Sequence, residues 1–358
     1  MGSFEVINPG LLTTVQDEGR FEHQQSGVCV AGVMDPFAHK VANILCGNAN
    51  LNEAVLEASM MGPTLTFNDD AYIAITGADL SPAIDGLPVK TWQSFIIKAG
   101  STLSFGGMVA GARAYIGIYG GMDIPVVMGS KSTYAKAKIG GYEGRPLQKG
   151  DSISYSKTYL GGKAPMQLPP NCIPAYEKEN TLRVVLGPQD DAFTAEGIGT
   201  FLSSCYTVSN EADRMGYRLE GGKIQHKDSG DIISDGMIMG AVQIPGQGQP
   251  IILMADRQTT GGYTKIAAVI YADLYKVAQA KPGDLMRFSR VSIEEAQDIY
   301  IEFHRTLDEI AGSLQPAAIE KPPVAPSTAP SAAQAGEATA YDLWINGEHH
   351  SVSVQRLT

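Results

Sequence analysis

Basic residues are scarce in this sequence, and its cysteines follow no pattern. The 358 residues include 27 Lys and Arg against 38 Asp and Glu, which gives a net charge of −11. Because a nucleic-acid-binding surface needs concentrated positive charge, no such ligand is expected. The four cysteines lack the CxxC spacing of zinc sites and the framework of small secreted proteins. Neither a metal site nor disulfides are therefore predicted, and a cytoplasmic location is favoured.

Long apolar runs and nucleotide-binding motifs are also missing. Nowhere do about 18 apolar residues follow one another, and no basic segment precedes an apolar core at the N-terminus, so neither a membrane-spanning helix nor a signal peptide is expected. The segment GSKST at 129–133 lacks the GxxxxGK[ST] order of a P-loop, and any ATP is therefore expected to be bound with or by a partner chain. The absence of HExxH and GxSxG argues against a zinc protease and a serine hydrolase.

Glycine, by contrast, is abundant, with 40 residues that separate short β-prone runs. Six such runs lie between 53 and 156, each bounded by Gly, Pro, Asn or Asp. They read AVLEA, PTLTF, AYIAIT, SFIIKA, STLSF and ARAYIGIY. A similar block extends from 181 to 290, and a Pro- and Gly-rich segment at 160–176 separates the two. Regular short strands favour barrels or sandwiches over parallel βα units, so a mainly β fold with about two domains is predicted.

Two segments have clear helix signals. Asp35 is suited to the N-cap of a helix, with Pro36 at its first position and Gly47 at its end. Residues 292–311 begin with the capping box SIEE and continue with apolar residues along one face, which predicts an amphipathic helix.

The densest group of polar residues follows an apolar run in PIILMADRQTTGGY, residues 250–263. Unbroken apolar residues at 251–254 are typical of a strand covered on both faces, so this strand delivers Asp256, Arg257 and Gln258 to one place. Adjacent side chains of an extended backbone point to opposite sides, and Asp256 and Arg257 are therefore expected to have different partners. The alternative interpretation is a strand capped by a polar hairpin.

Other polar side chains lie beside predicted turns. Arg214, in ADRMGYRLEG, could grip a small anionic substrate through its guanidinium, or it could form an ion pair that braces a hairpin. Gln189 and Gln243 carry neutral amides, which could pair with a lactam or urea or simply satisfy turn backbone. Gln16 and Asp17 belong to a further polar cluster that follows a β-prone run.

Seven segments resemble, in the same order, the family of biotin-dependent carboxyltransferase subdomains A and B. This family includes allophanate hydrolase subunit 2, KipA-type proteins and the C subunit of bacterial 5-oxoprolinase. The resemblance covers about residues 4–290. The segments are INPGLLTTVQDEGR, GVMDPFAHKVANILCGN, AVLEASMMGPTLTF, YGGMDIPVVMGSKSTY, GRPLQKGD, DRMGYRLEG and ISDGMIMGAVQIPGQGQPIILMADRQTTGGY. The sequence departs from the family at the GVPxxGAMD motif, where it has Cys29, Val30 and Val33, and at Thr264, where proline is usual.

The resemblance implies two cyclophilin-like β-barrel domains. The expected boundaries are 1–160 for the first barrel and 177–312 for the second with its closing helix. Relatives work with a B-type, KipI-like protein of similar cyclophilin-like barrels, and in 5-oxoprolinase also with an A-type, deacetylase-like protein. Both are implied as partners here.

The C-terminal region has a different composition. Residues 313–340 are rich in Pro, Ala and Ser and predict a disordered linker. Residues 341–358 alternate apolar and polar side chains around Asn346-Gly347, which predicts a hairpin. In urea carboxylase relatives a biotinyl domain follows these subdomains, and the tail resembles the opening hairpin of such a domain. It contains no Met-Lys-Met, so no biotin is expected on this chain as it stands, and two interpretations stay open: a degenerate remnant of a biotinyl domain or a truncated sequence.

The first functional hypothesis is the C subunit of an ATP-dependent 5-oxoprolinase, which opens the lactam of 5-oxo-L-proline to L-glutamate. In this scheme Arg257 or Arg214 holds the substrate carboxylate, Asp256 accepts the ring N–H or positions a group for proton transfer, and Tyr263 lies against the ring. The expected catalytic residues are thus Asp256, Arg257 and Tyr263. The expected substrate-binding residues are Arg214, Gln189, Gln243, Gln258, Asp35, Gln16 and Asp17.

Two alternatives remain open from the resemblance. One is the carboxyltransferase component of a urea or amide carboxylase that receives its carboxyl group from biotin on another chain. The other is a KipA-like regulatory protein that captures an inhibitor of a histidine kinase.

Overall fold

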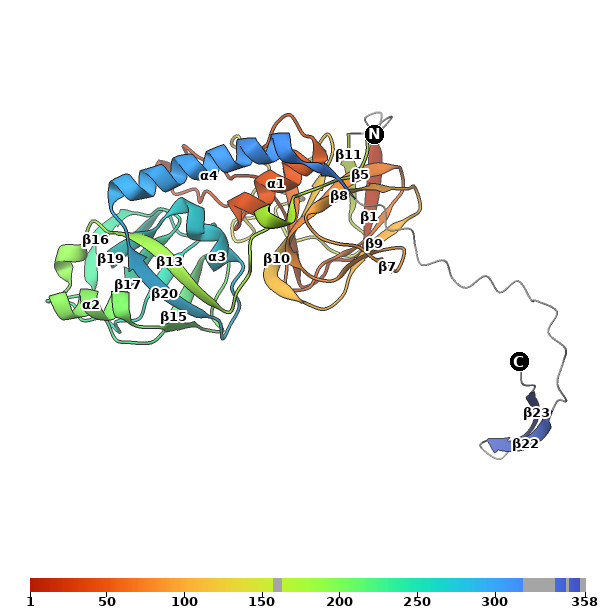
Figure 1. The fold of residues 1–358 in the computed structure, drawn as a ribbon. Coiled ribbons are helices and arrows are strands. Elements are labelled where there is room, and N and C mark those ends of the chain that lie inside the picture. The colour runs from red at the N-terminus through yellow and green to blue at the C-terminus, as the bar shows by residue number, and fades with distance from the viewer. Residues whose placement is uncertain (157–162, 318–338, 346–347, 355–358) are drawn as a thin grey trace. The chain divides into compact units, whose positions relative to one another are not determined.

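The computed structural model describes residues 1–156, 163–317, 339–345 and 348–354 (Figure 1). Strands dominate these residues, and the described part of the chain contains four α-helices. The predicted mainly β fold class is confirmed. Residues 1–317 form one compact unit and residues 318–358 another, so the predicted domain boundary between 160 and 177 stays a prediction.

Residues 2–167, here called the two-sheet part, contain two antiparallel sheets around one apolar core. The first sheet has the order β11-β1-β4-β9-β6-β7, and the second has β2-β3-β10-β5-β8-β12, to which the later strand β21 adds. The core between them includes Phe4, Leu56, Leu65, Ile73 and Ile116, all fully buried. The strands are β1 (Gly2–Asn8), β2 (Leu12–Gln16), β3 (Val55–Ser59), β4 (Thr64–Phe67), β5 (Ala71–Asp79), β6 (Pro82–Ile84), β7 (Leu87–Pro88), β8 (Gln93–Ile97), β9 (Thr102–Phe105), β10 (Ala110–Ile118), β11 (Ser152–Tyr155), β12 (Met166–Gln167) and β21 (Gln315–Pro316).

Residues 179–290, here called the closed barrel, form a ring of seven strands. The order is β13-β20-β14-β15-β18-β17-β19, and β19 pairs with β13 to complete the ring. Closure leaves no free edge within the ring, and only β16 lies outside it, paired with β19. The strands are β13 (Glu179–Leu186), β14 (Tyr206–Val208), β15 (Gly216–Glu220), β16 (Asp231–Gly236), β17 (Ala241–Ile244), β18 (Ile251–Leu253), β19 (Thr260–Val269) and β20 (Leu285–Arg290).

The first predicted helix is confirmed with both of its ends. Helix α1 (Pro36–Cys46) begins after Asp35, whose side chain accepts a hydrogen bond from the Ala38 N–H, and it ends at Gly47 with φ of 71°. The helix is buried against β5 and β10, on the face of the second sheet that does not meet the first. Two shorter helices, α2 (Ala195–Ser203) and α3 (Leu274–Ala278), pack on the closed barrel.

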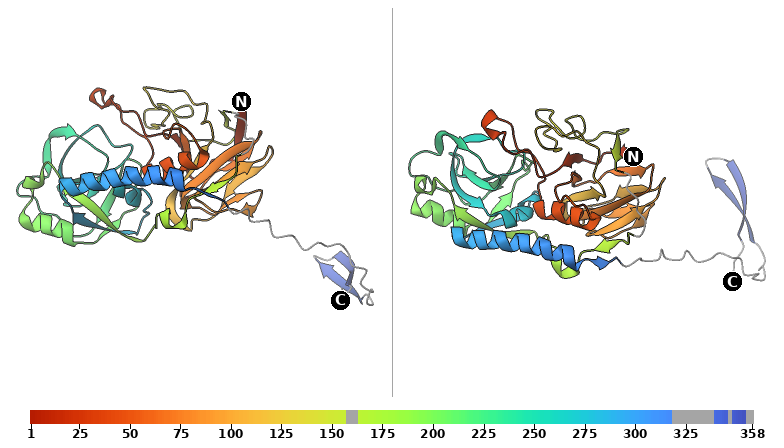
Figure 2. Two further views of the ribbon diagram at one scale, coloured as in Figure 1. Left: turned by 45° about the horizontal axis from the view of Figure 1, so that its top comes forward. Right: turned by 90° about the horizontal axis from the view of Figure 1, so that it is seen from above.

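Helix α4 (Ile293–Ser313) extends along both the closed barrel and the two-sheet part (Figure 1), and Figure 2 shows the same arrangement from two other sides. Its capping box, formed by Ser292 and Glu295, is present as predicted. Leu307 and Ile310 are buried in the core that contains α1. The N-terminal half of the predicted apolar face is different, because Ile293 is 59% exposed.

The second unit contains an antiparallel pair, β22 (Thr339–Ile345) and β23 (Glu348–Val354). The predicted hairpin strands are therefore present, whereas the predicted turn at 346–347 and most of the predicted linker lie outside the described residues. None of the helices in the described ranges is both long and apolar enough to cross a bilayer.

Candidate functional site

Arg214 joins the two-sheet part to the closed barrel. It precedes β15, and its Nε and Nη2 donate to the two carboxylate oxygens of Asp256 at 3.1 and 2.9 Å. Its Nη1 donates to Glu57 of β3, and its Nη2 also donates to the carbonyl of Gly32 at 2.6 Å. Burial lowers the pKa of Arg214, but the carboxylates of Asp256 and Glu57 raise it by more, so the net shift is upward. All three nitrogens of this guanidinium have protein partners.

The carbonyl of Gly32 reaches Arg214 because residue 32 has no side chain. Its φ is +93°, a conformation that L side chains rarely adopt, and a Cβ there would stand 2.5 Å from the carbonyl oxygen of Glu18. The backbone therefore approaches the arginine along a path that only glycine can follow.

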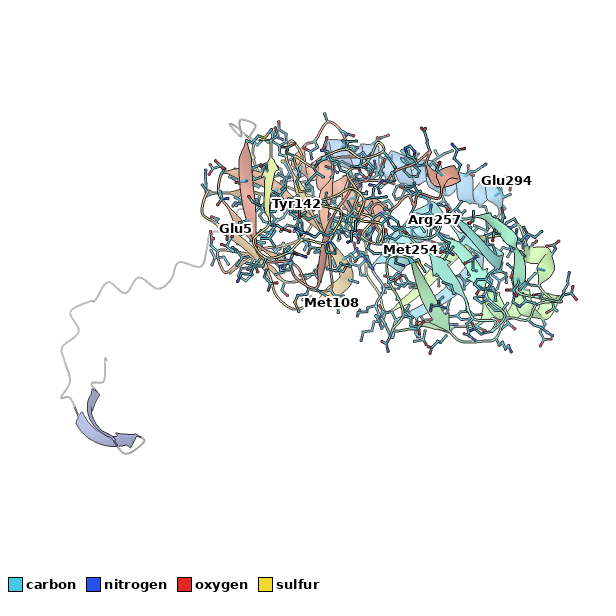
Figure 3. All side chains as sticks on the ribbon, turned by 180° about the vertical axis from the view of Figure 1, so that it is seen from behind. Glu5, Met108, Tyr142, Met254, Arg257 and Glu294 are labelled. Atoms are coloured by element: carbon cyan, nitrogen blue, oxygen red, sulfur yellow. The ribbon has the colours of Figure 1, made fainter. Side chains whose placement is uncertain are left out.

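Arg257 is also buried, but its partners are different. Its Nε and Nη1 donate to the carbonyls of Met237 and Met254 at 3.3 and 3.2 Å, and no carboxylate of the described residues lies within 4 Å of its nitrogens. Burial lowers the pKa of Arg257 to about 10, although Cys29 and, to a smaller extent, Asp256 oppose this shift. Figure 3 shows Arg257 and Met254 where the closed barrel faces the two-sheet part. A buried cation whose hydrogen bonds go only to carbonyls favours the binding of an anion.

Asp256 and Arg257 thus point to different partners, one to a guanidinium and the other to backbone carbonyls. Both carboxylate oxygens of Asp256 are held by Arg214. Asp256 therefore holds Arg214 in place. Of the two arginines, Arg257 is the one more available to a ligand.

A chain of hydrogen bonds continues from Glu57 across the junction. The hydroxyl of Tyr115 donates to Glu57 at 2.9 Å and accepts from the Asp35 N–H at 2.9 Å. Gln279, just after α3 of the closed barrel, donates to the Asp35 carboxylate at 2.8 Å and accepts from the backbone N–H of Arg113 at 2.9 Å. Asp35 therefore caps α1 and also binds the closed barrel through Gln279.

Asp35 is expected to make stability depend on pH. It is fully buried, and desolvation raises its pKa from 3.8 to about 6. Between these values the folded protein binds a proton that the unfolded chain does not, so this group favours the folded state more as the pH falls. Relative to Asp35→Asn, which keeps an N-cap acceptor, the wild type is expected to gain about 1 kcal/mol in free energy of unfolding from pH 7 to pH 5. Urea denaturation of both proteins at each pH measures this difference, and parallel pH profiles would contradict it.

Gln16 and Asp17 hold a loop inside the two-sheet part. The Asp17 carboxylate accepts from the hydroxyls of Ser130 and Ser132 at 2.6 and 2.5 Å and from the Lys131 N–H at 2.6 Å. Burial raises the pKa of Asp17, but these hydrogen bonds outweigh it and the net shift is downward. Gln16 donates to the carbonyl of Thr133 at 3.1 Å. The segment GSKST is therefore a structural loop fixed by these two side chains.

The predicted amide side chains gather around β19. Gln243 donates to the carbonyl of Tyr263 at 3.4 Å, and Gln189 accepts from the Lys265 N–H at 3.2 Å. A Cβ at Gly261 would stand 2.7 Å from Nε2 of Gln243 and 3.4 Å from Nε2 of Gln258, so glycine makes room for both amides.

Met237 connects this amide group to Arg257. Its carbonyl accepts from Arg257, and its methyl would stand 2.8 Å from a Cβ at Gly261. Beside the amides lies a cavity of about 150 Å³, lined in part by Lys265, whose Nζ contacts Asp235 at 2.5 Å. Met237 thus links Arg257 to the amides on the closed barrel, and Gln189 reaches the cavity-lining Lys265, but neither Arg257 nor an amide side chain lines the cavity itself. Gln16 and Asp17 lie in the two-sheet part.

Sequence reasoning missed several residues of the junction, among them Glu57, Tyr115 and Gln279. Only Glu57 had a usable signal, because it is a lone carboxylate in the apolar run AVLEA, and a buried charge needs a partner. Tyr115 and Gln279 have no such signal, since a tyrosine in a strand and a glutamine after a helix are ordinary.

A family comparison matches residues 26–290 to the family described as carboxyltransferase domain, subdomain A and B. Two curated proteins of similar length also match. The chain is 36% identical to the C subunit of 5-oxoprolinase from Escherichia coli over 87% of this chain and 98% of that protein. It is also 36% identical to the C subunit of 5-oxoprolinase from Haemophilus influenzae, over 86% of this chain and 97% of that protein.

Among solved structures, the urea amidolyase of K. lactis superposes with a TM-score of 0.81 at 31% identity. The match covers 86% of this chain but only 20% of that much longer one. The chain therefore shares one region with urea amidolyase and nearly the whole length of the two bacterial subunits.

Proposed function

This chain belongs to the family of carboxyltransferase domains with subdomains A and B, and on that premise we propose that it is the C subunit of an ATP-dependent 5-oxoprolinase. The observation that carries the proposal is the 36% identity to the Escherichia coli 5-oxoprolinase C subunit over 98% of that relative's length. Urea amidolyase is matched over only a fifth of its chain, so that match concerns one region of a longer enzyme.

The chemistry of the candidate site supports this choice. At neutral pH 5-oxoproline carries a carboxylate, whereas urea carries no charge. Arg257 is buried, its hydrogen bonds go to carbonyls, and no carboxylate of the described residues pairs with it directly, so a substrate carboxylate would supply a direct ionic partner. The amides of Gln243 and Gln258 offer hydrogen-bond partners to the lactam, and Tyr263, which is partly exposed, would lie against the ring.

In this proposal Arg214 and Asp256 have a structural role beside the site, because they already bind each other. Asp35 holds the junction through Gln279, while Gln16 and Asp17 hold the neighbouring loop. An unstrained lactam resists water, and ATP would activate its carbonyl. Since the P-loop order is missing, we assign ATP to a site formed with or by a partner chain. The partners would be the B-type, KipI-like protein and the A-type, deacetylase-like protein.

The proposal predicts that 5-oxo-L-proline yields L-glutamate only when ATP, this chain and both partner proteins are present. Glutamate release is measured with the three purified proteins and again with each one omitted. Omission of this chain is expected to abolish the reaction, because its site would hold the substrate carboxylate. An unchanged rate without this chain would refute the proposal.

A urea or amide carboxylase component is the second candidate, favoured by the structural match to urea amidolyase. It would require a biotinylated partner. Streptavidin detection of biotin in the purified complex, together with ATP- and bicarbonate-dependent consumption of urea, would favour this candidate over the lactamase.

A further inference from the structure

An open apolar groove of about 480 Å³ runs between the N-terminal half of α4 and the closed barrel. Helix α4 contributes Ile293, Tyr300 and Ile301, and the barrel contributes Ala268 and Ile270 among others. Ile293, Tyr300 and Ile301 remain 59, 47 and 65% exposed. Three large apolar side chains exposed together on one surface are typical of an interaction site.

The groove continues onto the adjoining edge of the barrel. Ala268 lines both the groove and the 150 Å³ cavity beside Lys265, and Ile238, which is 60% exposed, lines that cavity. Beyond it lies β16, the strand outside the closed ring, with Ile233 almost fully exposed. Exposed apolar side chains therefore occur in the groove and again near the edge strand, where the Lys265–Asp235 ion pair also lines the cavity.

Negative charge borders this groove. Glu294 and Asp298 lie on α4 beside the groove-lining residues, and neither forms an ion pair with a described residue. Arg305, the one Arg or Lys on the helix, is paired with Glu302 and Glu309, while the exposed Arg290 lies three residues before the helix begins. Figure 3 shows Glu294 at the end of the closed barrel away from the two-sheet part. A partner for this surface needs an apolar face with basic residues beside it.

We propose that this groove binds an amphipathic helix of a partner protein of the complex, with apolar side chains in the groove and Lys or Arg residues against Glu294 and Asp298. The assignment of the partner rests on the proposed function. The groove residues of α4 recur at positions 293, 296, 297, 300 and 301, the spacing of one helix face, and this face is free to pack against a second helix. Charge complementarity then fixes the orientation of the partner.

The proposal is tested by titrating each purified partner, the B-type and the A-type protein, into the full-length chain by calorimetry. Ile301→Glu places a charge in the groove and is expected to weaken the binding of one partner at least tenfold. Asp298→Lys is expected to weaken the same partner several-fold at low salt and less at high salt, because screening reduces rim electrostatics. The matched control is Val109→Glu, which changes a valine of similar exposure, 70%, in the two-sheet part and is expected to bind like the wild type.

Thermal melting of each variant establishes that it is folded. Wild-type affinity of folded Ile301→Glu for both partners would overturn the proposal, as would failure of the wild type to bind either one. Self-association of the wild type that Ile301→Glu abolishes would instead identify a second copy as the occupant. If removal of residues 318–358 increases partner affinity at the groove, the tail is a competing occupant, and the proposal of a vacant partner site is wrong. Glutamate release is measured separately. If Ile301→Glu weakens partner binding but the wild-type complex releases no glutamate, the groove proposal is supported and only the proposed function is refuted.

Discussion

Replacement of Arg214 by methionine is expected to lower the free energy of unfolding by about 3–5 kcal/mol. The substitution leaves Glu57, only 1% exposed, as a buried carboxylate without its ionic partner, and it releases Asp256 and the carbonyl of Gly32. The cost comes from the uncompensated charge more than from the lost attraction. Urea denaturation of wild type and variant measures the change.

The control is Arg218→Met, four residues further along the chain. Arg218 is half exposed and pairs with Glu211 at the surface, so its loss is expected to cost less than about 1 kcal/mol. Adding Glu57→Gln to Arg214→Met should recover part of the lost stability, because the unpaired charge is then gone. Equal stability of Arg214→Met and Arg218→Met would show that the buried pair does not hold the junction.

The second large effect is expected on catalysis. If the chain acts as proposed, Arg257→Ala should lower kcat/KM for 5-oxo-L-proline about 100-fold, as is typical when one partner of a buried charge-assisted pair is removed. Most of the loss should appear in KM if the guanidinium binds the carboxylate equally in the ground and transition states. Glutamate release by the reconstituted complex measures both constants.

Measurements of stability distinguish substrate binding by Arg257 from a structural role of this residue. Because Arg257 has no carboxylate partner among the described residues, Arg257→Ala should not lose the stability that Arg214→Met loses, and removal of a poorly compensated buried charge can even stabilise the fold. Arg257→Lys, which keeps the charge but not the planar fork, should retain part of the activity. Full activity of folded Arg257→Ala would exclude this residue from substrate binding.

Local signals predicted much of the fold. The ends of α1 follow from Asp35, Pro36 and Gly47, whose backbone preferences act within a few residues, and the capping box of α4 is equally local. The short β-prone runs became strands for the same reason. Tertiary contacts decided which half of α4 is covered, because Leu307 and Ile310 meet α1 while Ile293 does not.

The sequence by itself determined which segments are strands and helices, and it placed Asp256 and Arg257 together just after a buried strand. Only the tertiary structure decided what those side chains do. Arg214 and Glu57 are 157 positions apart, and Gln279 and Asp35 are 244 apart. No local preference links such residues, because their contact depends on how the closed barrel docks against the two-sheet part. That docking gives Arg214 the carboxylate of Glu57 in addition to that of Asp256 and gives Arg257 none, which is why two arginines that look alike in the sequence differ in the folded protein.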